Sequence, residues 1–431
     1  MAGLIGSLNT ASNAMRTNQT VIQTINHNIS NMNTPGYSRQ VANLQTNVAY
    51  TRPGMSTCPK GAGQLGQGAS VVSITRVRNS FYDYQLRSES HNYGNAAVKA
   101  EQFTNIESIF NEPSETGISA SLNDFFDSFS ELSKNPTSTS AKKYLVEKSN
   151  LLTSSMNQAV RKLDTLKDNI KIQEDTTIRD INDILKQLDT LEKDIKIAEA
   201  VGKNPNDLLD RKDSLIDELS FKLDINNPDV QAALADGNLD AAEIANVDVS
   251  GELQGIKDMQ KEIEGIMGDM ETLMNSLANA INDVYKNDQT APDNRDFFVI
   301  GTDKNGLPTI NVNQDIKDNP ASITMSSDKA LALSEVKSKK FTINGENVTI
   351  SGFYNDIIQE VGYKTQETLR EESNRRALIF SIEDSKASES GVSLDEEMIN
   401  LMQFEHAYTA TAKVASTVDS LLDVVINGLI R

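Results

Sequence analysis

The residue patterns that most suggest chemistry are two glycine-containing turns. The first, GAGQLG, places glycines at Gly61, Gly63 and Gly66, the spacing with which dinucleotide-binding proteins hold a pyrophosphate. That function requires a buried strand before the loop and a helix after it. Here the polar segment TRPGMSTCPK precedes the loop and the strand-like ASVVSITRV follows it. We therefore expect a structural turn and no bound cofactor.

The second turn, GTDKNG from Gly301 to Gly306, is similar to part of a calcium-binding loop. Its first ligand position would be Gly301, which has no side-chain oxygen. The glutamate that should follow Gly306 by six residues is also missing. The composition of the segment instead predicts a tight turn between two strands.

The ionisable residues do not form a recognisable catalytic or metal-binding pattern. His27, His91 and His406 are far apart in the sequence, and none is spaced as a metal ligand from a cysteine or an acid. The acidic run Asp395 to Glu397 suits the first turn of a helix, where the helix dipole favours carboxylates. The methionines between residues 259 and 274 have helical spacing and are expected to fill a core. We predict no catalytic, cofactor-binding or metal-binding residues, and no enzyme activity.

Composition narrows the class of protein. Of the 431 residues, 38% are hydrophobic and only 5% aromatic, which favours long helices packed through narrow apolar stripes. The net charge of −20 argues against a nucleic-acid partner, because an acidic chain gains nothing from displacing counterions. The single cysteine, Cys58, cannot form an internal disulfide. We expect no membrane insertion, since no apolar run approaches the ~18 residues of a span, and no cleaved signal peptide.

Both ends of the chain carry an apolar repeat of seven residues, the pattern of a coiled-coil helix. The first repeat stops at NTPGYS, where Pro35 and Gly36 end the helix. Because each helix has one narrow apolar face, we expect the two helices to pair. The N-terminal seam comprises Leu4, Leu8, Ala11, Met15, Asn18, Ile22, Ile25, Ile29 and Met32. The C-terminal seam comprises Leu394, Leu401, Phe404, Tyr408, Thr411, Ala415, Val418, Leu422, Val425 and Leu429.

The middle of the chain predicts a rod of long helices with small β elements. Helical patterns cover residues 81–110, 141–200 and 253–285, and the last has the clearest internal heptad repeat. Residues 48–76 predict loops and a β-hairpin, and strand-like segments lie at 297–300, 309–312 and 340–351, the last with a turn signal at Asn344–Gly345.

We therefore predict a mainly α fold with a nested, elongated multi-domain architecture, paired terminal helices and minor β pieces. The predicted terminal coiled-coil domain comprises residues 1–45 plus 390–431. The predicted helical rod domain with β hairpins comprises residues 46–223 plus 251–389. Residues 224–250 are predicted to form a short insertion or loop.

Several segments are more specific than a periodic pattern. The opening segment from Leu4 to Gln40 contains NTPGYSRQ, and it resembles the N-terminus of the flagellar axial protein family, in particular its hook-associated protein 1 branch. Similar segments follow in the order known for that branch: GQGASVVSITRVRNSFYDYQLR, NDLLDRKDSLIDELS, GELQGI and SLDEEMINLMQFEHAYTATAKVASTVDSLLDVVINGL. Longer members carry a β domain where this chain has only residues 221–250, so that outer domain is expected to be reduced or absent.

The resemblance implies a structural subunit of the bacterial flagellum, located outside the cell at the junction between hook and filament. Its implied partners are neighbouring copies of itself, the hook protein, a second junction protein and a flagellar export chaperone at the C-terminal helix. Export through the flagellar type III channel is implied to occur unfolded. A lone helix with Asn18 in its seam is marginal in water, so the terminal helices are expected to be disordered in a free subunit and to fold on assembly.

The resemblance also suggests roles for individual residues. Asn33, Thr34, Pro35, Gly36 and Tyr37 would form a hinge between the inner helix and the outer parts. The assembly interface would comprise Leu4, Leu8, Met15, Ile22, Ile25, Ile29, Leu394, Leu401, Phe404, Tyr408, Val418, Leu422 and Val425. Three alternatives stay open: a hook or rod subunit, an enzyme carried on an axial-protein scaffold, and a coiled-coil adhesin or effector. The Ser-Arg-Gln after Tyr37 argues against the first, and the shortness of 221–250 argues against the second.

Overall fold

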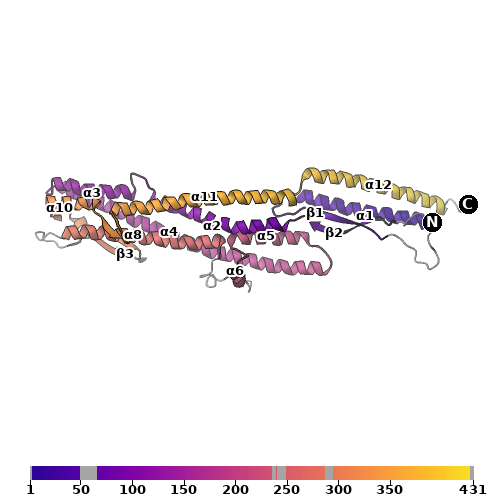
Figure 1. The fold of residues 1–431 in the computed structure, drawn as a ribbon, viewed down its shortest axis with the longest axis horizontal. Helices are drawn as coiled ribbons and strands as arrows, with labels where there is room; N and C mark the ends of the chain where they lie inside the picture. Colours follow the sequence, from indigo (N-terminus) through magenta and orange to yellow (C-terminus); the bar gives the residue numbers. More distant parts are fainter. Residues whose placement is uncertain (1, 49–65, 235–238, 240–248, 287–294, 428–431) are drawn as a thin grey trace.

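The computed structural model describes residues 2–48, 66–234, 239, 249–286 and 295–427. The molecule is a long rod in which both chain ends lie at one end (Figure 1). It is 76% helical, and the strands of its described part form three two-stranded antiparallel sheets. The mainly α, elongated fold predicted from the sequence is confirmed.

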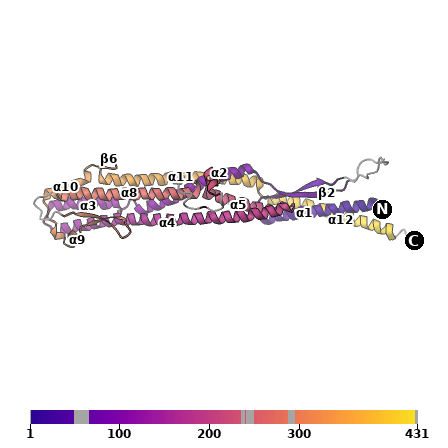
Figure 2. The same ribbon diagram turned by 90° about the horizontal axis from the view of Figure 1, so that it is seen from below.

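The end of the rod that carries the termini is built from two helices and one hairpin. Helix α1 (Ala2–Asn31) runs towards the middle of the molecule, and α12 (Leu394–Asn427) runs back beside it (Figure 1). Strands β1 (Gln40–Thr46) and β2 (Ala69–Arg76) pair with each other and lie along α1 (Figure 2). We call these four elements the terminal domain. The domain boundary expected at residue 45 would separate the two paired strands of this hairpin.

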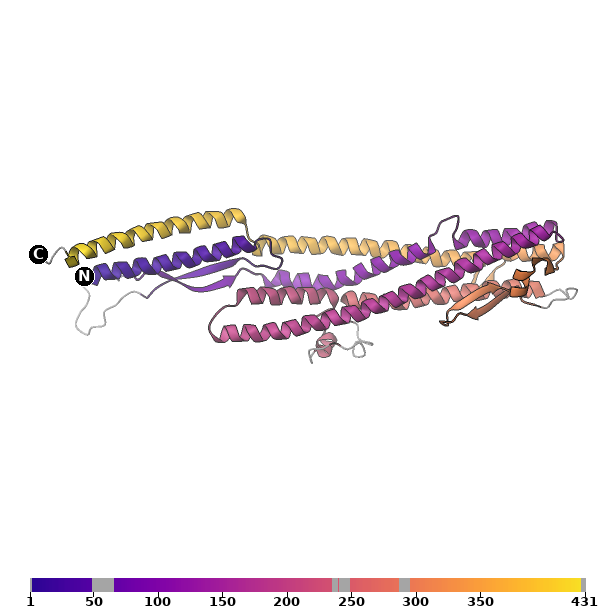
Figure 3. The same ribbon diagram turned by 180° about the vertical axis from the view of Figure 1, so that it is seen from behind.

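The rest of the rod is a bundle of long helices that continues from the terminal domain (Figure 3). Its main helices are α2 (Ser80–Phe110), α4 (Thr139–Ala200), α5 (Asn206–Lys222), α8 (Gly251–Lys286) and α11 (Ile350–Ser390). Polar caps fix several helix starts, since Asn79, Ser138 and Thr349 each accept a hydrogen bond from a backbone N–H of the first turn.

Smaller elements complete the end of the rod far from the termini. They are α3 (Ile118–Lys134), β3 (Phe298–Thr302), β4 (Pro308–Val312), α9 (Gln314–Asp318), the 3-10 helix Pro320–Ser322, α10 (Ser327–Glu335), the 3-10 helix Val336–Ser338, β5 (Phe341–Ile343) and β6 (Glu346–Val348). Aromatic rings fill the core here, with centroids 5.0 to 6.4 Å apart among Phe125, Phe126, Phe129, Phe297 and Phe298.

Helix α8 is buried over a wider face than its heptad repeat predicts. Most residues of the two expected tracks are buried, from Leu253 to Ile281. A third track is buried as well: Met259, Ile266, Leu273 and Ala280. The reason is that α8 contacts helices on several sides, including α2, α4 and α10, whereas a two-stranded coil has only one partner.

The turns expected from the sequence are present where the structure describes them. GTDKNG joins β3 to β4, and the Asp303 carboxylate accepts the backbone N–H groups of Asn305 and Leu307 at 2.8 and 3.1 Å. Asn344 and Gly345 join β5 to β6 with φ of +49° and +86°, which this turn requires. Within 224–250, residues Pro228–Ala233 form the short helix α6. Gly61 and Gly63 of the GAGQLG turn, and Cys58, lie outside the described residues.

Asparagine side chains hold extended segments against the helices. On α4, Asn157 donates to the carbonyl oxygen of Ile310 at 2.8 Å and accepts from its N–H at 3.0 Å. On α8, Asn282 binds both backbone groups of Phe298 in the same way, at 2.8 and 2.9 Å. Since Ile310 is on β4 and Phe298 is on β3, the hairpin is held at both of its edges.

Replacing Asn157 by alanine is expected to lower the free energy of unfolding by about 1–3 kcal/mol, because the buried N–H and C=O of Ile310 lose their partners. Urea unfolding followed by circular dichroism would measure the change. Asn169→Ala, at an exposed site on the same helix, is the matched control and should change stability by less than about 0.5 kcal/mol. Equal effects of the two variants would show that the amide contact contributes nothing.

Candidate functional site

The two terminal helices contact each other along the seams expected from the sequence. On α12, every seam position from Leu401 to Val425 is buried or half-buried, and Val418 is only 7% exposed. The first position, Leu394, is 44% exposed and lies outside the contact. On α1, Ile25 is buried, and Leu4, Leu8, Met15, Ile22 and Ile29 are half-buried. Half-burial of so many apolar residues leaves part of each seam open to solvent.

A second face of α1 packs against the β1–β2 hairpin, and sequence reasoning missed it. Thr17, Val21, Thr24 and Asn28 are all buried and recur at intervals of four, three and four residues. The Thr17 hydroxyl donates to the carbonyl oxygen of Ala69 on β2 at 2.8 Å. The spacing is helical, but three of the four residues are polar, so an apolar pattern could not find them.

The outer face of α12, meaning the positions outside the seam, exposes two groups of large apolar side chains. Met398, Ile399 and Met402 lie near the start of the helix and Val414, Leu421, Val424 and Ile426 near its end, with exposed fractions between 43% and 64%. Single exposed apolar residues are common, but seven on one helix are more than solubility favours. This outer face, together with the open parts of the seams, is the candidate assembly surface.

The terminal domain meets the rod at a joint centred on Asn28. This side chain is 1% exposed. Its amide donates to the Gln40 carbonyl oxygen at 2.9 Å and to Glu397 Oε1 at 3.2 Å. Its oxygen accepts from the Tyr37 hydroxyl at 2.7 Å and from the Gln40 N–H at 2.9 Å. One residue on α1 thus fixes the turn, the start of β1 and the first turn of α12.

The expected hinge residues form a compact turn on the surface of α5. Asn33, Thr34, Pro35 and Gly36 are exposed, and Tyr37 is half-buried. Gly36 has φ of +77°, and a β-carbon there would lie 2.2 Å from the Ser214 hydroxyl oxygen on α5. Glycine therefore permits both the left-handed backbone and the close approach to the rod.

The side of α5 that faces the joint is acidic. Asp207, Asp210, Asp213 and Asp217 recur at three- and four-residue intervals, so they lie on one face of the helix. Arg76, which ends β2, pairs with Asp210 at 2.7 Å and with Asp213 at 2.9 Å.

Three further cations, all from the rod, complete this network. Arg87 on α2 pairs with Asp217 at 2.6 Å, and Lys386 on α11 pairs with the same carboxylate at 3.2 Å. Arg78 pairs with Asp83 at 2.6 Å and with Asp213 at 3.1 Å. The NDLLDRKDSLIDELS segment and the basic residues around β2 are therefore each other's partners.

Burial and charge shift the pKa values of groups at the joint in different directions. Burial raises the pKa of Tyr37, and the nearby carboxylates Asp207, Asp210 and Glu397 raise it further, so the phenol stays neutral and can donate to Asn28. For Asp83, burial alone would raise the pKa, but hydrogen bonds and charge from Arg78 and Lys386 outweigh it and lower the pKa. Asp83 therefore stays ionised as a stable part of the network.

Glu397 behaves in the opposite way. Burial raises the pKa of its carboxyl, although the hydrogen bond from Asn28 and the charge of Arg39 act to lower it. A raised pKa means that the folded state binds this proton more tightly than the unfolded chain does. The stability contributed by the protonated form is present at low pH and is lost as the pH rises through the raised pKa.

Glu397→Gln is therefore expected to stabilise the terminal domain at pH 7 and to reduce the loss of stability between about pH 4 and pH 7. Thermal unfolding of the wild-type chain and the variant across that range would measure the difference. Glu405→Gln is the control, because Glu405 lies at an exposed site further along the same helix. If the difference in stability between Glu397→Gln and the wild-type chain does not grow as the pH rises over this range, the pKa of Glu397 is not raised in the folded chain.

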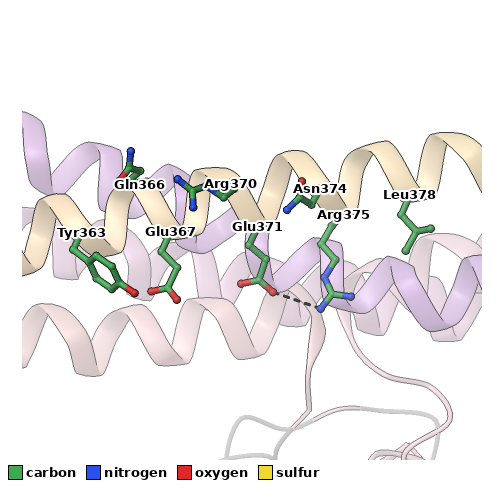
Figure 4. A pocket seen from close by; sticks show the side chains of 8 residues that line it. All are labelled: Tyr363, Gln366, Glu367, Arg370, Glu371, Asn374, Arg375 and Leu378. Carbon is green, nitrogen blue, oxygen red and sulfur yellow. Dashed lines mark ion pairs between the residues drawn. The ribbon is translucent and has the colours of Figure 1, made fainter.

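The remaining surface offers little for catalysis. A groove of about 550 Å³ runs along α11 and is lined by Tyr363, Gln366, Glu367, Arg370, Glu371, Asn374, Arg375 and Leu378 (Figure 4). Arg375 pairs with Glu371 at 3.5 Å and with Glu89 of α2 at 2.9 Å. Among the residues that the structure describes, no three His, Cys, Asp or Glu side chains are placed to share a metal ion. None of the described helices is both long and apolar enough to span a membrane.

Comparison with known proteins assigns two parts of the chain to flagellar families. Residues 103–232 match the family model of the flagellar hook-associated protein FlgK helical domain. Residues 386–428 match the model of the flagellar basal body rod FlgEFG protein C-terminal region. The second match covers α12, the helix that carries the candidate assembly surface.

Whole-chain comparisons agree with these matches. Flagellar hook-associated protein 1 of Bacillus subtilis is 30% identical over 504 aligned positions, which cover 100% of this chain and 99% of that protein. The Escherichia coli protein of the same name is 22% identical, with 97% and 99% covered. The hook junction protein FlgK of Burkholderia pseudomallei has a similar fold, with a TM-score of 0.57, 12% identity and coverage of 72% of this chain and 100% of that one. This chain belongs to the flagellar hook-associated protein 1 family.

Proposed function

We propose that the chain is a non-enzymatic structural subunit that forms the junction between the hook and the filament of a bacterial flagellum. The observation that carries this proposal is the candidate assembly surface on the α1–α12 pair, in a chain whose family is structural. The surface is rich in apolar residues and lies at the end of a rod, which suits packing against identical neighbours.

The same surface suggests the partners. Neighbouring copies of the chain would cover part of the outer face of α12. The hook protein would contact the assembled subunits on one side, and a second junction protein would contact them on the other. Before assembly, an export chaperone would cover the exposed apolar residues of α12, as a groove-forming protein covers an amphipathic helix. The location would be the flagellum, outside the cell.

A hook or rod subunit is the second candidate, because the family model that matches α12 is that of basal body rod proteins. The match of residues 103–232 to a hook-associated helical domain favours the junction. An enzyme on an axial-protein scaffold is the weaker alternative, since the family to which the chain belongs is a structural one.

Deleting the gene and examining cells by electron microscopy would separate these functions. A junction subunit predicts complete hooks without filaments and filament protein released into the medium. Hooks that are absent or shortened would instead indicate a hook or rod subunit. Normal filaments would contradict both, and expression of the intact chain in the deletion strain is the control.

A further inference from the structure

Helix α11 has two halves that are held to the rod in different ways. The first half contributes four residues to the main core cluster: Ile350, Tyr354, Ile357 and Val361. All of α11 is described, and beyond Thr365 its only buried apolar residue is Ile382. The second half, residues 366–390, therefore gains little stability from apolar burial.

The position of this second half makes its weak packing important. It leads through residues 391–393 into α12, and the sequence predicts that α12 is disordered in a free subunit. Most helical stability in proteins comes from tertiary packing, so a helix with little packing loses its order from a free end inwards. Without another contact, disorder in α12 would be expected to spread back through α11 as far as the core residue Val361.

An ionic cluster near the end of α11 supplies such a contact. Lys386 Nζ lies 2.9 Å from Asp83 Oδ1 on α2 and 3.2 Å from Asp217 Oδ2 on α5. The side chains of Lys386, Asp83 and Asp217 are only 21%, 10% and 23% exposed. Ion pairs shielded in this way are screened by salt less than exposed pairs, and loss of one partner leaves the others poorly solvated.

Both carboxylates are fixed in place by the rod itself. Arg78 donates to Asp83 at 2.6 Å, and Arg87 on α2 donates to Asp217 at 2.6 Å. Helix α5, which carries Asp217, is anchored by apolar side chains that are buried with those of α4. Lys386 and its four partners all lie outside α1, α12, β1 and β2, so this support does not require the terminal domain to be folded.

We propose that Lys386, bound to Asp83 and Asp217, is a clamp that keeps the second half of α11 helical on the rod while α12 is unfolded. Disorder of the C-terminal segment then stops at residues 391–393 and does not reach the core. The clamp keeps α11 ready to continue into α12, so that only the terminal domain has to fold on assembly. This proposal goes beyond the junction function and does not depend on it.

Amide hydrogen exchange on the purified full-length monomer, followed by mass spectrometry, tests the clamp. In the wild-type chain, the amides of residues 370–388 should exchange more slowly than those of α12. Lys386→Met removes the ammonium group and keeps the apolar stem, so residues 370–388 should exchange at least about tenfold faster. Amides in α4 and α8 should keep their rates, because these helices belong to the core clusters.

Two further variants separate the clamp from general effects on the helix. Arg370→Met makes a comparable change at an exposed site of α11 and should leave the rates of residues 370–388 unchanged. Asp217→Asn keeps the shape of the acid and removes its charge, so it should speed exchange in 370–388 even if Lys386→Met fails to fold by circular dichroism.

Three results would overturn the proposal. The first is wild-type exchange in residues 370–388 of folded Lys386→Met, and the second is wild-type exchange there in Asp217→Asn. The third is equal exchange in residues 370–388 and in α12 of the wild-type chain, because order would then not end at the clamp.

Discussion

Deleting residues 391–431 is expected to abolish incorporation of the chain into flagella while the rod stays folded. The deletion removes the outer face of α12 and the partner of the α1 seam. The main core cluster draws on α2, α3, α4, α8, α10 and α11, so it remains whole. Electron microscopy of cells that express only the truncated chain measures assembly, and far-UV circular dichroism with limited proteolysis measures folding of the rod.

A triple substitution separates the two roles of α12. Met402→Gln, Val414→Gln and Leu421→Gln alter only exposed positions, so the α1–α12 pair should form while assembly fails. If truncation unfolds the whole chain, the rod depends on α12 and the nested architecture is wrong. If the triple variant assembles normally, the outer face of α12 is not the assembly surface.

Asn28→Ala is expected to destabilise the terminal domain by roughly 3–4 kcal/mol, at about 1 kcal/mol for each hydrogen bond that it makes. The loss should be local, because the rod has its own core. Amide hydrogen exchange should show faster exchange in α1, β1 and the first turn of α12, with rates in α4 and α8 unchanged.

Asn26→Ala is the matched control for this substitution, since Asn26 lies on the same helix and is exposed. Its exchange rates should equal those of the wild-type chain. The same change in both variants would mean that the four hydrogen bonds of Asn28 do not hold the joint. Unchanged rates in Asn28→Ala would lead to the same conclusion.

The terminal seams could be predicted from sequence because they are apolar and repeat every seven residues. The buried face of α1 that carries Thr17, Thr24 and Asn28 has equally regular spacing, but its residues are polar. Burial of such residues depends on hydrogen-bond partners in the β1–β2 hairpin, which the α1 sequence does not contain. Sequence patterns therefore find contacts made by apolar area and miss contacts made by matched polar groups.

Helix α11 shows a second limit. It is 41 residues long, yet no continuous helix was expected there. Between residues 366 and 381 only Thr368, Glu372, Arg375 and Ile379 are buried or half-buried, so the buried stripe is one residue wide and mostly polar. A stripe of this kind is too weak to predict from hydrophobic periodicity.

The acidic face of α5 and the NTPGYSRQ turn illustrate a third limit. Each could be recognised as a specific segment, but they are separated by more than 160 residues and their pairing is a property of the folded chain. Nothing in either segment alone identifies the other as its partner. The geometry of the joint, with Ser38 on Asp210 and Arg76 on Asp213, emerges only when the rod places α5 beside β2.

Asn28 forms hydrogen bonds to residues near both ends of the chain, and this affects the order of folding. Its bond to Glu397 joins residues 369 apart in sequence, so closing that loop in an unfolded chain would be slow. Once the rod has formed, the start of α2 and the end of α11 lie side by side and hold α1 and α12 near each other. Few conformations then remain to be searched before the two helices pair. The terminal domain should therefore fold last. A copy that lacks its final residues cannot complete the surface, so the topology itself excludes unfinished chains from assembly.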